Sequence, residues 1–178
     1  MQYYNRNIQI DTNVIVDIFK NIQPHTKMLV FGLGYDSKMW YEGTNKNTYF
    51  VENNENYIEL NKNDIPSDHI IQYDYLNITC ESSVTKTDED LKSYKIPDAL
   101  LLAAPFDIIL IDGPEGWCIS KPGRLIPCFW TRSLSKSGTL IYVDDAKRPL
   151  ENYAINKFFH SDRKEIFNER GGCVKIYL

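Results

Sequence analysis

The chain has 178 residues, of which 43% are hydrophobic and 25% are charged, and its formal net charge is −4. This length suits one domain with a buried core and is too short for two full domains, so we expect a single domain over residues 1–178. The acidic balance excludes indiscriminate nucleic-acid binding, which needs a basic surface, and we predict no nucleic-acid partner.

The cysteines and histidines show no zinc or disulfide signature. The four cysteines contain no CxxC pair, and the three histidines are scattered along the chain. No apolar run approaches the roughly 20 residues that a membrane span requires. The first residues also lack the apolar core of a signal peptide. We therefore expect an intracellular, soluble protein with no membrane partner.

Helical and strand-like patterns alternate along the first part of the chain. Apolar residues at helical spacing predict a helix over residues 11–22, and a second, short helix is expected after Asn53. The polar stretch at residues 81–90 is typical of an exposed, flexible loop. Short aliphatic runs predict four strands, at residues 27–31, 47–52, 69–74 and 106–112.

The second part continues this alternation and then changes. Residues 123–134 and 150–159 are predicted helices on either side of a strand at residues 138–143. Two terminal strands, at residues 165–167 and 173–177, are joined through a pair of glycines, which predicts an antiparallel hairpin. The whole pattern predicts an α/β fold, a Rossmann-like, doubly wound and mostly parallel sheet with an antiparallel hairpin at its C-terminal edge.

Glycines or acids follow five successive predicted strands. Ligands of a doubly wound sheet bind outside the carboxyl ends of its strands. We therefore expect these residues to share one crevice. They are Gly32, Gly34, Glu52, Asp74, Asp112, Asp144 and Asp145.

The first two strand ends are typical of a site for the ribose of adenosine. The turn at Gly32 and Gly34 lets a ligand approach the backbone, and Glu52 is placed to accept both hydroxyl groups of the ribose. The third glycine of the dinucleotide motif is absent, because position 37 is Ser. These residues alone leave NAD and S-adenosylmethionine as alternatives.

The remaining acids favour S-adenosylmethionine. This donor carries a sulfonium and an ammonium group, whereas NAD carries two phosphates, so an acidic rim favours the former. Tyr73 or Asp74 is predicted to meet the adenine, and Asp112 the methionine end. The predicted donor-binding residues are Gly32, Gly34, Asp36, Glu52, Tyr73, Asp74 and Asp112.

Asp112, Asp144 and Asp145 form the predicted reacting centre. Methyl transfer to a hydroxyl group needs a base that removes the proton or a metal ion that lowers the pKa of the hydroxyl. Three converging carboxylates could act as the base, or they could ligate Mg²⁺, Mn²⁺ or Ca²⁺. The residues leave both alternatives open.

Residues that follow these acids are predicted to hold the acceptor. Arg124, Lys147 and Arg148 could bind an anionic acceptor such as a uronic acid or a nucleotide sugar, although solvated helix faces carry such charges as well. Trp117 lies in a predicted loop after Asp112, where it could stack on a sugar ring.

With these residues in view, the chain resembles the plant polysaccharide-biosynthesis methyltransferases of the DUF579 group, typified by glucuronoxylan 4-O-methyltransferase. The resemblance runs from about residue 28 to residue 159. The matching stretches are LVFGLGYDS at 29–37 with Trp40, TYFVE at 48–52, FDIILIDGPEG at 106–116 and PGR at 122–124.

The resemblance implies S-adenosylmethionine as methyl donor and a carbohydrate hydroxyl as acceptor. Members of the group usually have a histidine before the acid that follows the fifth strand, where this chain has Asp144 and Asp145. The chain is also shorter than the plant members and lacks their membrane anchor, so their acceptor and Golgi location do not transfer. The resemblance places donor binding on Gly32, Gly34, Glu52 and Asp112, and acceptor-side roles on Gly123, Arg124 and Asp144.

We therefore predict an O-methyltransferase that acts on a sugar hydroxyl of a glycan, polysaccharide or nucleotide sugar. The three aspartates are also similar in arrangement to those of cation-dependent, catechol-type O-methyltransferases. One alternative is thus a cation-dependent O-methyltransferase of a small hydroxylated metabolite. Another is a non-catalytic module that binds only the nucleoside.

Overall fold

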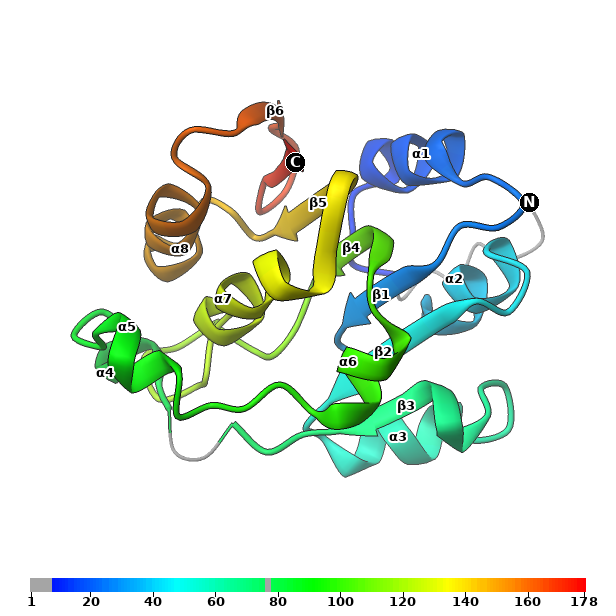
Figure 1. Ribbon diagram of the computed structural model, residues 1–178, viewed down its shortest axis with the longest axis horizontal. Coiled ribbons are helices and arrows are strands. Elements are labelled where there is room, and N and C mark those ends of the chain that lie inside the picture. Colours follow the sequence, from blue (N-terminus) through cyan, green and yellow to red (C-terminus); the bar gives the residue numbers. More distant parts are fainter. Residues whose placement is uncertain (1–7, 76–77) are drawn as a thin grey trace.

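The computed structural model describes residues 8–75 and 78–178, and a seven-stranded sheet forms its centre (Figure 1). The strand order is β3-β2-β1-β4-β5-β7-β6; the first five strands are parallel, and β7 is antiparallel to both of its neighbours. This confirms the predicted doubly wound α/β fold and its C-terminal hairpin. The strands are β1 (Met28–Phe31), β2 (Thr48–Glu52), β3 (Ile70–Gln72), β4 (Phe106–Ile111), β5 (Ser135–Asp144), β6 (Arg163–Phe167) and β7 (Cys173–Tyr177).

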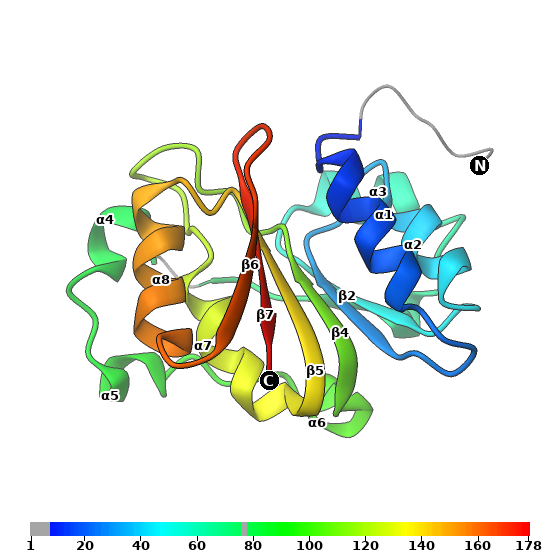
Figure 2. The same cartoon turned by 90° about the horizontal axis from the view of Figure 1, so that it is seen from above.

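Helices cover both faces of this sheet (Figure 2). The helices α1 to α3 lie on one face, and α7 and α8 lie on the other, with α4 and α5 beyond them. The helices are α1 (Thr12–Asn21), α2 (Ser37–Gly43), α3 (Glu55–Asn61), α4 (Cys80–Ser83), α5 (Asp88–Leu91), α6 (Asp98–Ala103), α7 (Leu125–Leu134) and α8 (Pro149–Phe159), with a 3₁₀ turn at Ser67–His69.

Strand β1, which lies between β2 and β4, is buried on both faces because its successive side chains point alternately to the two helical layers. Met28 and Val30 pack in the core beneath α1 and α2, which includes Trp40. Leu29 packs in the opposite core, which includes Trp130 of α7. A short, wholly apolar run is therefore the pattern that a strand at this position needs.

The predicted loop at residues 81–90 is wrong in part, because the stretch contributes to the short helices α4 and α5. Thr79 and Thr87 each cap one of these helices through a capping box, in which the threonine oxygen accepts the N–H of the third helical residue. Buried Leu91 anchors the second helix in the core. The polar composition concealed these two helix starts.

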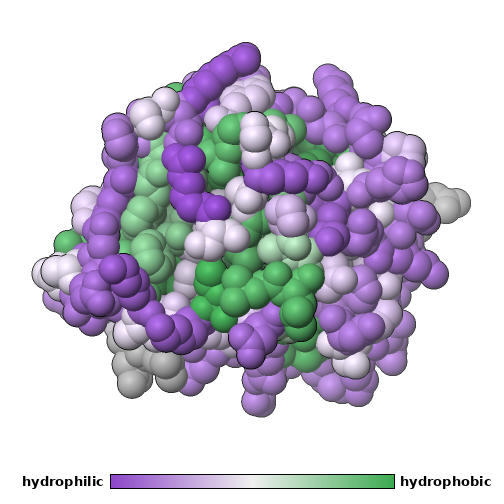
Figure 3. Space-filling model, viewed as in Figure 1, coloured by the Kyte–Doolittle hydropathy of each residue, from purple (hydrophilic) through white to green (hydrophobic). Residues whose placement is uncertain are grey.

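Much of the surface on the face of Figure 1 is hydrophilic, with an apolar area near its centre (Figure 3). Among the described residues, α6 carries the strongly exposed Leu102 beside Leu101. In the part of the chain that the structure covers, no helix combines the length and the apolar character needed to cross a membrane.

The register of the parallel strands determines which residues lie together at one edge of the sheet. Phe31 at the end of β1 pairs with Val51 of β2 and Ile111 of β4, and Ile111 pairs in turn with Val143 of β5. The residues that come next on these four strands therefore lie side by side at one edge of the sheet. They are Gly32, Glu52, Asp112 and Asp144.

Candidate functional site

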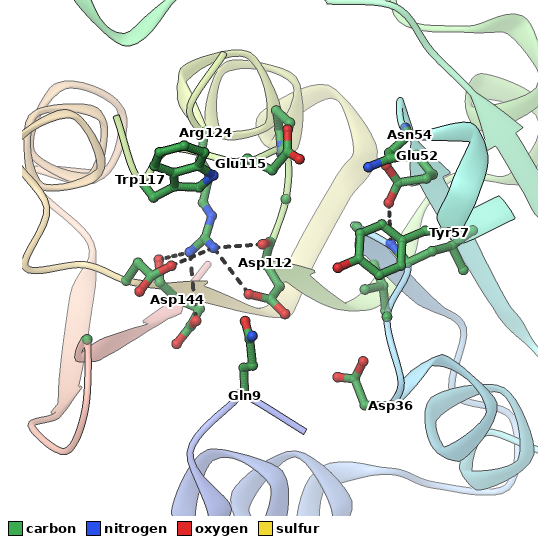
Figure 4. A pocket seen from close by; sticks show the side chains of 18 of the residues that line it. Gln9, Asp36, Glu52, Asn54, Tyr57, Asp112, Glu115, Trp117, Arg124 and Asp144 are labelled. Atoms are coloured by element: carbon green, nitrogen blue, oxygen red, sulfur yellow. Dashed lines mark hydrogen bonds and ion pairs between the residues drawn. The ribbon is translucent and has the colours of Figure 1, made fainter. Parts of the chain in front are cut away.

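A cleft opens at this edge of the sheet (Figure 4). Segments far apart in the chain line it, including the ends of β1, β2, β4 and β5, the residues before α1, and the turn between β6 and β7. The structure brings together most of the residues that the sequence predicted for the site. Those that line the cleft are Gly32, Gly34, Asp36, Glu52, Asp112, Trp117, Arg124, Asp144, Asp145 and Arg148.

Four predicted residues do not line the cleft, namely Tyr73, Asp74, Gly123 and Lys147. The ring of Tyr73 packs edge-on against Trp130, with 4.8 Å between the ring centroids, and so belongs to the core around α7. The Lys147 ammonium instead donates to the carbonyl oxygens of Asn168 and Arg170 in the β6–β7 turn. In the structure, Tyr73 thus packs in the core, and Lys147 stabilises the β6–β7 turn.

The floor of the cleft is a close contact between two glycine turns. Gly32 has a φ of +109°, and a Cβ on Gly113 would lie 2.8 Å from the Gly32 Cα atom. The backbone also joins β1 and β4 here, because the Asp112 N–H donates to the Phe31 carbonyl at 3.0 Å. Two turns without side chains can therefore meet and leave room above them for a ligand.

Replacing Gly32 with Ala is expected to lower the free energy of unfolding by about 1–3 kcal/mol more than replacing Gly138 with Ala. Both glycines have a positive φ, but a Cβ at position 138 meets nothing within 4 Å, whereas one at position 32 lies 3.1 Å from the Gly113 nitrogen. The pair therefore separates backbone strain from the turn contact. Chemical denaturation measures the free energy of unfolding of each variant. An equal decrease in the two variants would contradict the contact between the turns.

Glu52 ties the β1 turn to the start of α3. Its Oε2 accepts the Leu33 N–H at 2.6 Å, and its Oε1 accepts the N–H groups of Asn53 and Asn54 at 2.8 and 2.6 Å. Only 5% of the residue is exposed. Burial raises the pKa of Glu52, and the three backbone N–H groups oppose that rise. The carboxylate thus sits at the cleft wall with its geometry fixed by the backbone.

The sequence did not predict several residues that line the cleft beside Glu52. Tyr57 lies on α3 with its ring close to Glu52 (Figure 4), and Asn54 caps the same helix by accepting the Asn56 N–H. An aromatic residue in the first turn of the helix that follows Glu52 was the available signal.

Asp36 lies directly before α2 and lines the cleft. Its Oδ2 accepts the Trp40 indole N–H at 2.8 Å. Burial raises the pKa of Asp36, and the hydrogen bond from Trp40 counteracts this. Asp36 is thus one of the acidic residues in the cleft, and its role in donor binding stays a prediction.

Arg124 lies among the three predicted catalytic acids and is 3% exposed. Its Nη2 is 3.2 Å from Asp112 Oδ1 and 2.8 Å from Asp145 Oδ2, and its Nη1 is 3.8 Å from Asp144 Oδ2. The guanidinium also donates to the backbone carbonyls of Asp112 and Asp144. The sequence predicted a role in acceptor binding, but the structure gives this residue a set of internal partners at the start of α7.

Two of the acids that pair with Arg124, Asp112 and Asp144, hold protons more readily than ordinary carboxyl groups, because their pKa values are raised. Burial raises the pKa of Asp112 well above its usual value; Asp144 and Asp36 add to that rise, and the Arg124 charge opposes it. Burial likewise raises the pKa of Asp144. A carboxylate of raised pKa is a suitable proton acceptor for a hydroxyl group near neutral pH.

The same acids offer the oxygen donors that a divalent cation prefers, since carboxylate oxygens of Asp112, Asp144 and Asp145 lie within 4.8 Å of one another. The donor chemistry therefore fits a metal ion. However, the Arg124 guanidinium already pairs with all three acids and so competes with a metal ion for their oxygens. A metal ion at this point has to displace Arg124.

The residues before α1 close one side of the cleft. The Arg170 Nη1 donates to the backbone carbonyls of Ile8, Gln9 and Ile10, at 3.4, 2.5 and 3.3 Å. Gln9 lines the cleft and extends toward Asp112 (Figure 4). The β6–β7 turn thereby holds a distant segment of the chain against the site, a contact that no local pattern predicts.

Comparison with known proteins finds plant polysaccharide O-methyltransferases among the relatives of this chain. Arabinogalactan O-methyltransferase 2 of Arabidopsis thaliana is 25% identical over 180 residues, which cover 83% of this chain and 59% of the relative. Glucuronoxylan 4-O-methyltransferase 2 of the same plant is 28% identical over 145 residues, covering 70% and 50%. The chain thus spans about half the length of the curated relatives it matches. The resemblance predicted from the motifs is confirmed, although no protein-family model matches the chain.

Solved structures share the fold. A Staphylococcus aureus protein provisionally assigned as a caffeoyl-CoA O-methyltransferase superposes with a TM-score of 0.58 at 16% identity, covering 98% of this chain and 87% of that one. A methyltransferase from Geobacter sulfurreducens gives a TM-score of 0.54 at 13% identity, covering 96% and 80%. The chain therefore has the Rossmann-like fold of these methyltransferases.

Proposed function

We propose that this chain is an S-adenosylmethionine-dependent O-methyltransferase that acts on a carbohydrate hydroxyl group. One observation carries the proposal: a single cleft holds Glu52 and the Gly32 turn on one side and the acids around Asp112 on the other (Figure 4). The first side suits a ribose, and the second suits proton removal. The methyl group of a donor that lies across the cleft faces the second side.

On the donor side, the bare turn at Gly32 and Gly34 accommodates the nucleoside against the backbone. Both acceptor sites of Glu52 Oε1 are taken by backbone N–H groups, and Oε2 keeps one site that accepts a hydrogen bond from a ribose hydroxyl group. The ring of Tyr57 covers the adenine. The acidic groups beyond the turn stabilise the positive charges of the methionine portion.

The reaction is a displacement at the methyl carbon. The acceptor oxygen forms a bond to that carbon as the bond from the carbon to the sulfonium sulfur breaks, so S-adenosylhomocysteine leaves as a neutral thioether. The hydroxyl proton passes to Asp112, whose raised pKa suits this role. Holding the two substrates in line supplies much of the remaining acceleration.

The acceptor is proposed to be a sugar because of what surrounds the open side of the cleft. Trp117 is 68% exposed on the loop after Asp112 and lines the cleft. Arg148, which pairs with Asp145 at 2.8 Å, also lines it and is partly exposed. An aromatic face and a guanidinium suit a sugar ring that carries an acidic group. The relatives named above act, by name, on glucuronoxylan and arabinogalactan.

Replacing Trp117 with Ala is expected to raise the acceptor KM by about twofold to tenfold, since an aromatic contact contributes about 0.5–1.5 kcal/mol. Binding of S-adenosylhomocysteine should not change, because Trp117 is assigned to the acceptor side. Ile119→Ala is the matched control: it removes an equally exposed apolar side chain, also 68%, from the same loop but outside the cleft lining. Steady-state kinetics with both variants measure the difference, and an unchanged KM for W117A would exclude stacking.

One experiment tests the function directly. The protein is incubated with S-adenosylmethionine and a panel of uronic-acid oligosaccharides, arabinogalactan oligosaccharides, nucleotide sugars and small catechols, and products are detected by mass spectrometry. We expect a gain of one methyl group on a carbohydrate. Methylation of catechols alone would favour the small-metabolite alternative. Donor binding without any product would favour the nucleoside-binding module.

A further inference from the structure

We propose that Arg124 is a built-in cation of this site and takes the place that a divalent metal ion would occupy among Asp112, Asp144 and Asp145. The inference rests on the proposed function only in calling these acids the reacting centre. It makes the site independent of metal ions, although three carboxylates stand close enough to bind one.

The contacts of the guanidinium are those of a central cation. One nitrogen, Nη2, bridges two carboxylates, with 3.2 Å to Asp112 and 2.8 Å to Asp145. The other, Nη1, faces Asp144 and donates to its backbone carbonyl. A planar guanidinium presents its donors in fixed directions, so this arrangement holds the three acids in one geometry. A surface arginine that swings between solvent and one acid cannot do this.

Packing keeps Arg124 in place. It directly precedes α7 and follows Gly123, whose φ is +67° and where a Cβ would come within 2.3 Å of the Leu150 side chain on α8. The Nε atom of Arg124 is buried and has no hydrogen-bond partner among the described residues. The chain therefore brings this side chain into the site at a point where two helices meet.

A fourth carboxylate lies behind Arg124. Glu151 of α8 is fully buried, and neither of its oxygens has a hydrogen-bond partner within the described residues. Burial raises the pKa of Glu151, and the charges of Arg124 and Arg148 oppose that rise. Glu151 does not line the cleft, so it adds a further acidic partner for the Arg124 charge within the protein.

The consequence is a latent metal site. With Arg124 in place, Asp112, Asp144 and Asp145 already share a cation, so they do not recruit a hydrated Mg²⁺ or Mn²⁺. If the guanidinium is removed, three acids are left close together without their cation, and a divalent ion becomes the favoured replacement.

Mn²⁺ titration followed by electron paramagnetic resonance tests this, using the metal alone and the full chain. We expect the wild type to leave the free Mn²⁺ signal unchanged, and Arg124→Gln to deplete it and to gain a higher Tm with Mn²⁺. Adding Asp144→Asn to that variant should abolish the gain. Arg132→Gln is the control, because Arg132 pairs with Asp162 on the protein surface, away from the cleft.

Two results overturn the proposal. The first is depletion of the Mn²⁺ signal by wild-type protein in a way that Asp144→Asn abolishes. The second is a folded Arg124→Gln variant that binds no Mn²⁺. If Arg124→Gln does not fold, the wild-type titration and the same titration of Arg124→Lys, which keeps the charge and should bind no Mn²⁺, decide the question. None of these measurements requires methyl transfer, so failure of the proposed function would be seen separately.

Discussion

Asp112→Asn is expected to reduce kcat by about 10²- to 10⁴-fold, the usual contribution of a general base. Only Oδ1 of Asp112 pairs with Arg124, at 3.2 Å, and the carboxylate reaches into the cleft toward Gln9 (Figure 4). An amide has the same shape but does not take up the hydroxyl proton. The bond from Arg124 to the Asp112 backbone carbonyl remains, so the local fold should survive. Turnover at saturating donor and acceptor gives the measurement.

The control for this variant is Asp107→Asn on the same strand. Asp107 lies near the opposite end of β4, where it accepts the Lys27 N–H and pairs with Lys136. It should leave kcat unchanged. Donor affinity, measured with S-adenosylhomocysteine by calorimetry, separates two roles of Asp112. If D112N keeps its turnover and loses donor affinity, Asp112 binds the methionine portion and the base must be sought at Asp144 or Asp145.

Glu52→Gln is expected to weaken donor binding by about tenfold to a hundredfold, because hydrogen bonds to a charged group contribute about 1.5–3 kcal/mol. The substitution replaces one carboxylate oxygen with an NH₂ group. Both oxygens accept backbone N–H groups, from Leu33 on one side and from Asn53 and Asn54 on the other. Whichever way the amide turns, its NH₂ group therefore faces a backbone N–H group, and one of the hydrogen bonds that hold this side chain in place is lost. Calorimetry with S-adenosylhomocysteine measures the loss.

Glu55→Gln is the matched control, since Glu55 is an exposed acid in the first turn of α3 and does not line the cleft. The pH dependence gives a second readout. Burial raises the pKa of Glu52, so the side chain takes up a proton at a higher pH than an ordinary glutamate. Wild-type donor affinity should fall as pH decreases through that pKa, and E52Q should lack this part of the pH dependence. Equal affinities of wild type and E52Q would remove Glu52 from the donor site.

The sequence predicted the fold and which strand ends meet at the cleft, because both follow from local patterns. Short aliphatic runs that end in glycine or acid identify parallel strands, and the strand register then places Gly32, Glu52, Asp112 and Asp144 together. Tyr73 deviates because β3 ends at Gln72, which leaves the next side chain to pack against Trp130 instead of the cleft.

The remaining features depend on contacts between distant segments. The residue type of Arg124 indicates a charge but not the direction of its side chain, which is set by the packing of α7 on α8 and by the acids of two strands. The closure of the cleft by residues 8–10 likewise depends on Arg170, about 160 positions later in the chain. A pattern read along the sequence contains no information on either contact.

The contact between Arg170 and residues 8–10 also makes position 9 suitable for redesign. Its guanidinium binds main-chain oxygens only, so its hold does not depend on the side chains of that segment. Gln9 is the member of the segment that extends toward Asp112 (Figure 4). A library of substitutions at this position can therefore alter which acceptors enter while the supporting scaffold stays unchanged.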